Sequence, residues 1–471
     1  MMSLLQSHLS RPSRHPDLDT SIPALVVKMN HNGIQHSTLG ITRSLGRLGV
    51  PVYAAIEDCF VPAAMSRFLA GTFVLEKRPC SSGMMLDRLR KFHEQLNRAA
   101  VLIPTDDLAA IFIAENANVL EKWFLFPRLP AELPRRLANK KDLYFLCRRI
   151  GTSCPNAEFP VRLEDVRAFI DRAQFPVVLK ATEPTRRPDG TRSVTIAQTP
   201  HELESLYRQV LASGFTNLFL QEYIPESCSE DWVFHGYRNP TTGSVVRFTG
   251  KKLRSYPAFA GSTTLGVSAG NDALVRQAEQ LLDAISYAGI MDIDYRFDRR
   301  DGQYKLLDFN PRIGANFRMF EDYGGVDVVR ALHLDLSGRP VPSARLIENH
   351  TFIAEPYDLL ASVSYWRQGA LTLRIWWQSL AGESRETAWF SWDDPAPFIT
   401  MCIRLLGRAA MHGVLSGYAR LAFVVTRAHG YVYRLGRSRR NINLAVWRRD
   451  HRRPPAVVSA EGRSHEHTGK A

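Results

Sequence analysis

The sequence predicts an α/β and α+β protein in which an open parallel sheet comes first. Between residues 23 and 136, short apolar runs alternate with segments of helical spacing, which is typical of a parallel α/β sheet. A hairpin between residues 289 and 312 adds antiparallel strands further along the chain. An apolar content of 45% and a charged content of 23% are ordinary for a globular protein, and 471 residues suffice for about two to four domains.

The first domain is predicted from three buried strands, at residues 24–28, 50–55 and 99–103. A helix over residues 37–48 ends at Gly49. After the third strand comes a turn, Thr105-Asp106-Asp107, at the end of a strand where α/β sheets bind ligands. Asp106 could equally be the N-cap of a helix, and both interpretations stay open. The chain has no G-x-G-x-x-G after its first strand and no Walker A motif, which disfavours simple dinucleotide and P-loop sites.

The middle of the chain alternates strands with glycine- and proline-rich connections. A helix over residues 143–150 stops at Gly151, and a buried strand over 175–180 ends in Lys180. A lysine at a strand end is usually solvated, so alone it indicates little. The further predicted elements are a strand resuming at 194, strands 218–224 and 244–248, a glycine-punctuated stretch 261–270, and helices 271–288 and 326–336.

Strict alternation of apolar and charged residues from Met291 to Asp298 predicts a half-buried strand, and an Asp-Gly turn leads into a second strand over residues 304–309. A three-residue loop, 300–302, with Gly302 in the left-handed conformation, would place Asp294 opposite Asp308. It would also place Asp292 opposite Asn310, on the same face. Opposed carboxylates repel, and oxygen ligands suit Mg²⁺, so the face fits a divalent cation. A solvated polar face of an antiparallel sheet is the alternative.

These pieces, in this order, resemble the ATP-grasp superfamily, and in particular the predicted carboxylate–amine ligases related to D-aspartate ligase. The resemblance covers about residues 22–345 and a later section around Asp393-Asp394-Pro395. It implies a pre-ATP-grasp parallel domain, two α+β lobes that clamp ATP, and a basic helical C-terminal extension. The motifs that carry it are Ile103-Pro-Thr-Asp106, Asn139-Lys140, Phe175-Pro-Val-Val-Leu-Lys180, Gln221-Glu222-Tyr223-Ile224, Phe248-Thr-Gly-Lys-Lys-Leu-Arg-Ser-Tyr-Pro257, Asp294 and Leu307-Asp308-Phe309-Asn310-Pro311-Arg312.

The resemblance implies a nucleotide site made of Lys140, Lys180, Glu222, Tyr223, Ile224 and Glu230. The lysines would contact the ATP phosphates, the backbone of residues 222–224 the adenine edge, and Glu230 the ribose hydroxyls. Mg²⁺, with Mn²⁺ as the alternative ion, would be bound by Asp294, Asp308 and Asn310. Arg312, with Lys252 and Arg254, would steady the transferred phosphoryl group.

Two departures from the resemblance concern ligand length and the phosphate loop. Aspartate stands at positions 294 and 308, where glutamate is common in the family that the sequence resembles. The loop over residues 183–192 has one glycine, so Arg186, Arg187 or Arg192 could replace its backbone contacts with phosphate.

The resemblance and the chemistry together predict an ATP-dependent ligase for a small carboxylate and an amine, acting through an acyl phosphate. A carboxylate is a poor electrophile, and phosphorylation by ATP activates it. The alternatives are a small-molecule kinase with the same fold and a non-catalytic nucleotide-binding module. A homodimer is compatible with this function.

Charge is concentrated near the C-terminus. Residues 400–453 hold twelve Arg, no Lys and one acid, Asp450, which accounts for most of the net charge of +13. Arg420, Arg427 and Arg434 recur at seven-residue spacing among apolar residues, so helices here would carry a basic amphipathic face. That face could meet an anionic membrane, dock an acidic carrier protein, or pack on the catalytic body; modest aromatic interleaving disfavours nucleic acid.

Six scattered cysteines without metal-ligand spacing indicate a reducing cytosol. No apolar run is long enough for a signal peptide or a spanning helix, so we expect a cytoplasmic protein that could lie at the inner face of the membrane. The expected segments are a disordered leader 1–21, the parallel domain 22–136, a small lobe 137–232, a metal-binding lobe 233–345, the basic extension 346–453 and a disordered tail 454–471.

Overall fold

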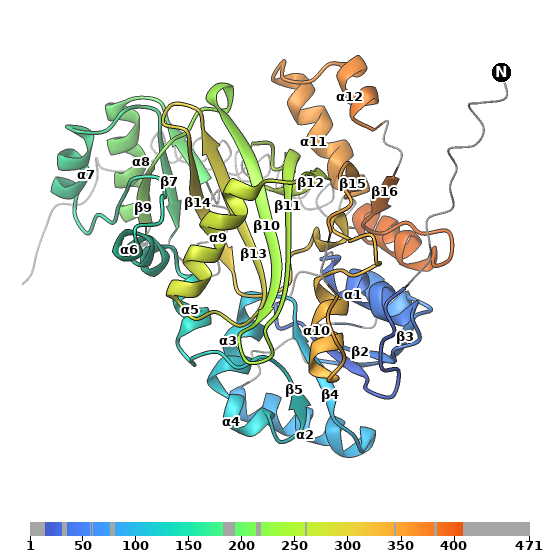
Figure 1. Ribbon diagram of the computed structural model, residues 1–471. Coiled ribbons are helices and arrows are strands. Elements are labelled where there is room, and N and C mark those ends of the chain that lie inside the picture. The colour runs from blue at the N-terminus through green and yellow to red at the C-terminus, as the bar shows by residue number, and fades with distance from the viewer. Residues whose placement is uncertain are drawn as a thin grey trace, which may run out of the picture. The chain divides into compact units, whose positions relative to one another are not determined.

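The structure is a computed structural model, drawn as a ribbon in Figure 1. It describes residues 15–30, 35–56, 58, 60–75, 81–181, 194–212, 218–259, 261–342, 345–380 and 384–407. The chain divides into two compact units, Met1–Cys402 and Ile403–Ala471, and the architecture below is that of the first. No helix among the described residues is long and apolar enough to span a bilayer.

The predicted N-terminal parallel sheet is confirmed. Its described strands follow the order β3-β2-β1-β4-β5, all parallel, with β1 at the centre. The strands are β1 Ala24–Val27, β2 Val52–Ile56, β3 Leu69–Val74, β4 Ala100–Pro104 and β5 Phe124–Leu125. The helices are α1 Ser37–Gly46, α2 Ser82–Leu96, α3 Asp107–Glu115 and α4 Ala117–Leu120. The sequence did not predict β3, which lies at the sheet edge with alternate residues exposed and so carries little apolar signal.

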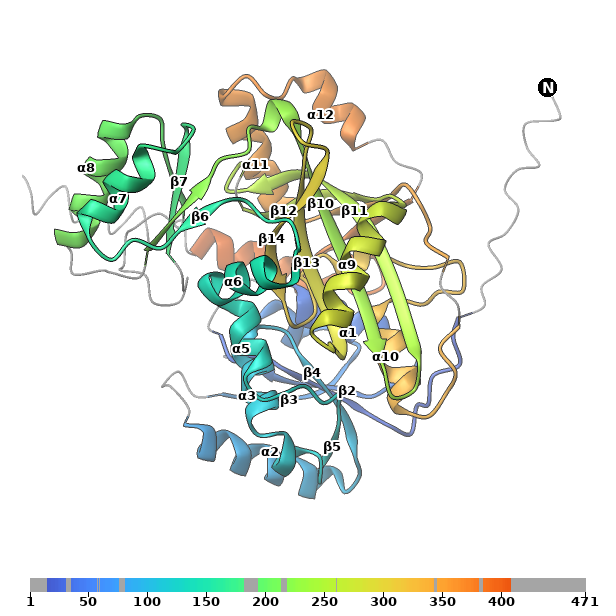
Figure 2. The ribbon, with the colours of Figure 1, turned by 60° about the vertical axis from the view of Figure 1, so that its left-hand side comes forward.

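A small antiparallel sheet follows, with strand order β6-β9-β7-β8 in the described part of the chain. Its strands are β6 Ala157–Glu158, β7 Val177–Ala181, β8 Val194–Ala197 and β9 Leu218–Glu222. Helices α7 Leu163–Ile170 and α8 Pro200–Ala212 share a hydrophobic core with it, and Figure 2 shows both beside β7. Helices α5 Leu133–Ala138 and α6 Lys140–Ile150 precede this lobe.

The large sheet has the order β14-β13-β10-β11-β12-β15-β16, and every described pair except β15–β16 is antiparallel. Its strands are β10 Ser229–Asn239, β11 Ser244–Tyr256, β12 Ser262–Ser268, β13 Gly289–Asp298, β14 Gln303–Asn310, β15 His350–Ile353 and β16 Ser384–Thr387. Its helices are α9 Asp272–Ala284, α10 Val328–Leu336, α11 Glu355–Arg367 and α12 Leu373–Ser379.

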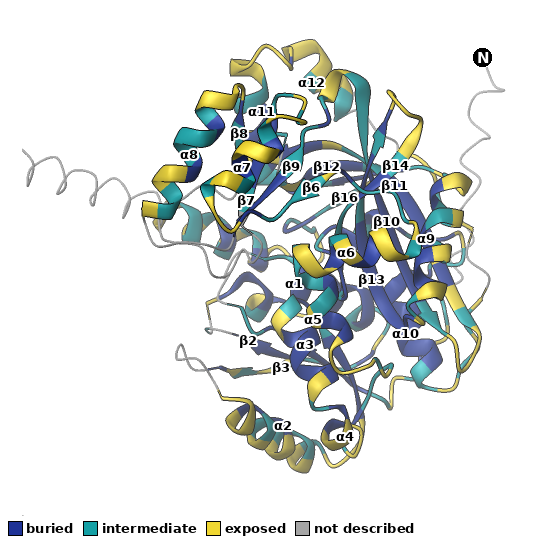
Figure 3. Ribbon diagram, turned by 90° about the vertical axis from the view of Figure 1, so that its left-hand side faces the viewer, coloured by how far each residue is buried: buried dark blue, intermediate teal, exposed yellow. Residues whose placement is uncertain are grey.

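The alternation along β13 separates a core face from a polar face. Met291, Ile293 and Tyr295 pack with α5, α6 and α9 in one hydrophobic cluster. Because side chains alternate along a strand, Asp292 and Asp294 project from the opposite face. Figure 3 shows the large sheet as mostly buried, so this polar face is not the solvated surface that the sequence left open as an alternative.

The register of the β13–β14 hairpin is right at the acidic end and wrong at the turn. Asp292 pairs with Asn310 and Asp294 with Asp308, as predicted. Gly302 has the predicted positive φ of 70°. The strands, however, close at Asp298 and Gln303, so the loop has four residues rather than three. A bulge opposite Asp294 and Tyr295 supplies the compensating shift, because it places one extra residue, Leu307, in β14.

Two expected segment boundaries also differ from the structure. The expected leader reaches residue 21, but Leu18 is already buried; residues 1–14 lie outside the described part. The expected extension begins at residue 346, but β15 and β16 continue the large sheet. Residues 350–353 are too short and too polar to stand out as a strand in the sequence. The basic sequence beyond residue 407 and the tail 454–471 lie outside the described residues.

Candidate functional site

The candidate site lies on the polar face of the hairpin, where two carboxylates are opposed in register. Asp294 on β13 and Asp308 on β14 are paired residues, and both side chains are partly accessible. Burial raises the pKa of Asp294, and the carboxylates of Asp292 and Asp308 add to this rise against the charge of Lys252. Such a pair is electrostatically unfavourable unless cations stand beside it.

Each carboxylate of the pair has a lysine partner from a different element. Lys252, on β11, places Nζ 2.8 Å from Oδ1 of Asp294. Lys140, the first residue of α6, forms an ion pair with Asp308. Asn139 starts that helix, because its Oδ1 accepts the backbone N–H groups of Lys141 at 3.0 Å and Asp142 at 3.2 Å. The two lysines therefore neutralise the acidic pair from two directions.

A second cluster, next to the pair, surrounds Asp292. His235, fully buried on β10, lies with Nε2 2.7 Å from Oδ1 of Asp292. Arg312 lies 3.3 Å from the other oxygen of Asp292 and donates from Nη2 to Oδ1 of Asn310 at 2.8 Å. Although burial opposes it, the charge of His235 and its hydrogen bond lower the pKa of Asp292 to about 2. Asp292 is thus a fixed anion that orients Arg312.

Glycine at position 314 is what allows this cluster to close. A Cβ atom there would lie 2.3 Å from Cε1 of His235 and 2.5 Å from Oδ2 of Asp292. No such contact is tolerated, so the chain after β14 can pass the Asp292–His235 pair only with glycine at this position.

The N-terminal domain reaches the site through the turn after β4. Asp106 is the N-cap of α3, accepting the Ala109 N–H at 2.9 Å, and its other oxygen accepts the N–H groups of Met29 and Asn30. The N-cap interpretation is therefore confirmed for Asp106. The neighbouring Asp107 lies 3.3 Å from Nε of Arg312, so the same turn also contributes to the site. Burial raises the pKa of Asp107, and the Arg312 charge opposes that rise.

Lys180 occupies the end of β7, as predicted, and faces Gln221 on β9. Its Nζ donates to Oε1 of Gln221 at 2.9 Å. Burial lowers the pKa of Lys180 to about 8, the charge of Lys140 adds to this fall, and the carboxylate of Asp308 opposes it. A buried amine whose hydrogen-bond partner among the described residues is a neutral amide is suited to receive an anionic group.

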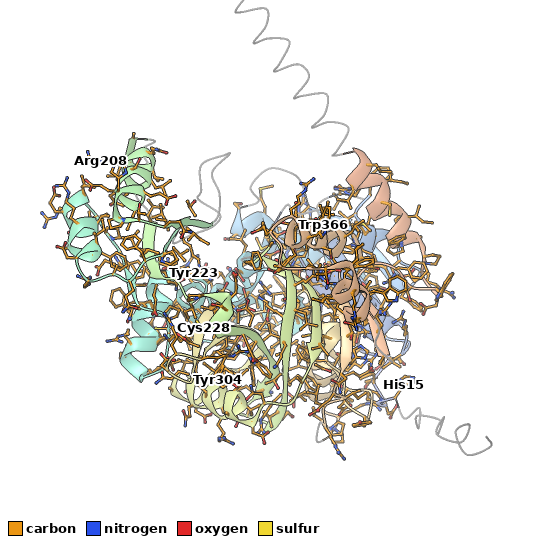
Figure 4. The ribbon with its side chains drawn as sticks, turned by 90° about the horizontal axis from the view of Figure 1, so that it is seen from above. His15, Arg208, Tyr223, Cys228, Tyr304 and Trp366 are labelled. Atoms are coloured by element: carbon orange, nitrogen blue, oxygen red, sulfur yellow. The ribbon has the colours of Figure 1, made fainter. Side chains whose placement is uncertain are left out.

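The segment predicted to meet adenine joins the small sheet to the large one, and Figure 4 labels Tyr223 there. The Glu222 N–H donates to the Asn156 carbonyl at 2.8 Å, and the Glu222 carboxylate pairs with Arg300. Nη1 of Arg296 donates to the Ile224 carbonyl at 3.1 Å. The Tyr223 hydroxyl donates to Glu226. Side chains of the large sheet thus fix this segment at both ends.

Glu230, predicted to hold ribose, is the second residue of β10 and belongs to a partly exposed ionic cluster. Its carboxylate lies 2.8 Å from Nζ of Lys251 and 2.7 Å from Nη2 of Arg299. These hydrogen bonds lower the pKa of Glu230 to about 2, so it is ionised at any physiological pH.

Arg254, predicted to act with Lys252, lies elsewhere. Its guanidinium is buried and makes a two-pronged ion pair with Asp358 on α11, at 2.9 and 2.7 Å. A third donor reaches Oγ of Ser379 at 2.6 Å. Lys252 and Arg254 are two residues apart, so a regular strand would point both side chains toward the same face. A register shift in β11 between Lys252 and Ser255 breaks this alternation.

The acidic pair fits a divalent metal only in part. The described residues contain no group of three or more His, Cys, Asp or Glu side chains that could hold a metal ion. Asp294, Asp308 and the carboxamide of Asn310 are oxygen donors, which suit Mg²⁺. Because Mg²⁺ prefers six oxygen ligands and commonly shares them with phosphates and water, this donor set fits an ion that arrives with a nucleotide.

The sequence did not find His235 and Gly314 as members of the site. Asp107 entered only as part of a turn that could bind a ligand, and Asp292 only as the residue opposite Asn310. A histidine in an apolar strand and a glycine after a hairpin have no signal of their own; only the adjacency of β10 and β13 brings them together. The arginines of the expected phosphate loop, residues 183–192, lie outside the described residues.

Comparisons with known proteins agree with this architecture. No protein-family model matches the chain. The chain is 22% identical over 311 residues to D-aspartate ligase from Enterococcus faecium, an alignment that covers 63% of this chain and 74% of that protein.

Two solved structures share the fold. One is the biotin carboxylase domain of a 2-oxoglutarate carboxylase from Hydrogenobacter thermophilus, in complex with MgADP and bicarbonate. It is 16% identical, with a TM-score of 0.52, over 70% of this chain and 73% of that chain. The other is an L-amino acid ligase from Bacillus licheniformis, 17% identical with a TM-score of 0.53, over 71% of this chain and 79% of that chain.

Proposed function

We propose that the chain is a member of the ATP-grasp superfamily and acts as an ATP- and Mg²⁺-dependent ligase that joins a carboxylate to an amine. In this reaction a carboxylate oxygen attacks the γ-phosphorus of ATP, giving an acyl phosphate and ADP. The amine then attacks the acyl carbon and expels phosphate, and the amine proton is lost to a base. The observation that supports this best is the opposed pair Asp294–Asp308, faced by Lys252 and Lys140 from two other elements.

In the proposed reaction the lysines bind and orient the phosphates. Lys140 is close enough to Lys180 for its charge to lower the pKa of Lys180, and both residues precede the large sheet in the chain. When ATP binds, Lys140 and Lys252 would exchange their aspartate partners for phosphate oxygens. Bound Mg²⁺ would neutralise the same aspartates and the phosphate charge. Each of these carboxylates and lysines would therefore keep a partner of opposite charge when ATP and Mg²⁺ are bound.

Arg312 is the residue we assign to the transferred phosphoryl group. Asp292, Asn310 and Asp107 hold its guanidinium from three sides, so its direction is fixed before substrate arrives. A preorganised cation costs no reorganisation as charge develops. For the nucleotide base, we propose that residues 222–224 present the backbone and that Glu230 binds ribose after releasing Lys251 or Arg299.

The direct experiment measures ADP release by the full-length protein across D- and L-amino acids and small carboxylic acids. The names of two similar proteins, D-aspartate ligase and L-amino acid ligase, make aspartate and the other amino acids the first substrates to test. We expect ADP release that depends on Mg²⁺ and on a carboxylate, with hydroxylamine trapping a hydroxamate. ADP release that needs an alcohol instead, without hydroxamate, would identify a kinase and contradict the proposal.

A further inference from the structure

An exposed apolar face covers α11 and α12, away from the proposed reaction centre. On α11, Leu359, Val363 and Trp366 are 59%, 40% and 62% exposed. On α12, Leu373, Ile375 and Trp377 are 77%, 51% and 71% exposed. Figures 1 and 2 both draw these two helices next to each other. We call five of these residues, Leu359, Val363, Trp366, Leu373 and Trp377, the tryptophan face; Ile375 lies on the other side of α12, because two helical residues span about 200°.

The part of the tryptophan face that lies on α11 belongs to a helix with a buried inner side. The opposite side of α11 is buried, with Asp358 accepting two hydrogen bonds from Arg254 and one from Thr264. Ala361 and Ser362 are buried on that side as well. The exposed residues follow at spacings of four and three, so they form a stripe on the outer side. Single exposed apolar residues are ordinary. A stripe that includes Trp366, next to a helix that exposes Trp377, indicates an interaction surface.

The charge around the face selects the kind of partner. From Leu359 to Gly382 the sequence has no acidic residue and two arginines, Arg367 and Arg374. Both arginines lie on the same two helices as the exposed tryptophans. Tryptophan together with arginine is typical of segments that lie in a membrane interface, where the ring is buried and the cation meets lipid phosphate.

We propose that the tryptophan face inserts into the surface of a membrane containing anionic lipid and holds the enzyme there peripherally. A second copy of the chain is the competing occupant. If two copies met through this face, Arg367 and Arg374 of one copy would lie against the same residues of the other. The face has no acidic residue that would offset this repulsion. An anionic bilayer offers both an apolar layer for the side chains and negative charge for the arginines.

The test compares full-length wild type with Trp366→Ala/Trp377→Ala. Both side chains are exposed, so the variant should fold; Phe60→Ala, at an aromatic residue that is 68% exposed on the N-terminal domain, is the matched control. Binding is measured by co-sedimentation with vesicles of phosphatidylcholine containing about one-third phosphatidylglycerol. We expect the double variant to bind about tenfold more weakly and the control to bind as wild type does. Bromine-labelled acyl chains should quench the fluorescence of wild type more than that of the double variant.

Three results would overturn the proposal. Wild type could fail to bind the anionic vesicles. The double variant could bind them as tightly as wild type, which would assign membrane binding, if any, to the basic sequence alone. Finally, sedimentation could show a wild-type dimer that the double variant lacks, which would make the face an interface between copies. Raising the salt should weaken binding but preserve the difference between the two proteins, because burial of apolar surface is not screened.

Discussion

At the scale of single residues, Asp308 separates the catalytic proposal from a structural one. Its ion pair with Lys140 is partly exposed, and such pairs contribute about 1 kcal/mol or less to stability. Asp308→Asn should therefore melt near the wild-type temperature yet lose ADP release on the order of 10²-fold or more, because a charged ligand for Mg²⁺ is gone. Calorimetry and ADP release at low millimolar Mg²⁺ measure the two quantities.

Asp301→Asn is the control for this substitution, since Asp301 lies at the tip of the same hairpin and is partly exposed. It should leave ADP release unchanged. Wild-type turnover by Asp308→Asn would remove the metal assignment.

A substitution at Lys180 tests the proposed contact with the ATP phosphates. Lys180→Ala removes the cation that ends β7, and we expect turnover to fall on the order of 10²-fold or the ATP requirement to rise correspondingly. Steady-state ADP release at several ATP concentrations distinguishes the two effects. Gln221→Ala removes only the amide partner of Lys180 and should have the smaller effect. Kinetics identical to wild type would make Lys180 a solvated strand end.

The depressed pKa of Lys180 gives a further prediction about pH. A lysine binds phosphate only when protonated, so ATP affinity should fall as pH rises through about 8, approaching tenfold per unit above it. Lys180→Arg keeps its charge in this range and should abolish the inflection. Isothermal titration with ATP from about pH 7 to 9.5 measures this; an inflection that persists in the arginine variant would assign it to another group. The same shift disfavours folding below pH 8, a cost relieved as pH rises toward 10.5.

Residue-level reasoning from the sequence had a clear limit. It found the donors that a motif or a strand end makes visible, namely Lys140, Lys180, Asp294 and Asp308. It could not find His235, because the role of this residue arises from Asp292, 57 residues away in the chain. It marked Asp107 only as part of a possible ligand-binding turn and did not foresee its partner Arg312, 205 residues away.

At the scale of elements, the buried ion pair Arg254–Asp358 helps to attach α11 to β11. Removing one partner of such a pair leaves an uncompensated charge, so Arg254→Met should destabilise the protein by about 3 kcal/mol or more in urea unfolding. Arg254→Met/Asp358→Leu should recover part of that loss, since both charges are then gone. If Arg254 instead acts on the phosphoryl group, the single variant would lose turnover while its unfolding midpoint stayed near that of wild type.

The hairpin shows which structural details the alternation of apolar and charged residues can predict. Alternation with period two predicted which side chains of β13 share a face, and this was confirmed. Loop length was wrong because Asp-Gly fits turns of more than one length. The acidic residues nevertheless pair as predicted because the bulge at Leu307 restores the register. The face of a residue was predictable; the local distortion that sets its partner was not.

At the scale of the whole molecule, the chemistry should not depend on the basic sequence at the end of the chain. The proposed site residues all precede residue 315, and the Arg-rich stretch begins after residue 399. A stop at Asn441 should leave ADP release on small substrates near wild type. It should weaken binding to anionic vesicles, with each lost Arg near the surface contributing about 1 kcal/mol, less at higher salt. A cooperatively melting truncation without activity would show that this section helps to build the site.

The fold class was predictable at this scale because parallel and antiparallel regions have different sequence periods, whereas the domain limits were not. The segment over residues 388–395 illustrates why. Asp394 is buried against the N-terminal domain, where it accepts hydrogen bonds from Arg43, Ser66 and the Arg67 N–H. A partner so distant in sequence leaves no local pattern at either end.

The Arg43–Asp394 contact also has a consequence for biosynthesis. Arg43 lies on α1, and its partner is made 351 residues later. At about 5 to 20 residues per second, this interval is roughly 20 to 70 s. During that time the nascent N-terminal sheet must hold a cation that the finished protein buries. The domain would therefore remain incompletely closed until Asp394 has been made, and this is the period in which a chaperone would have most to protect.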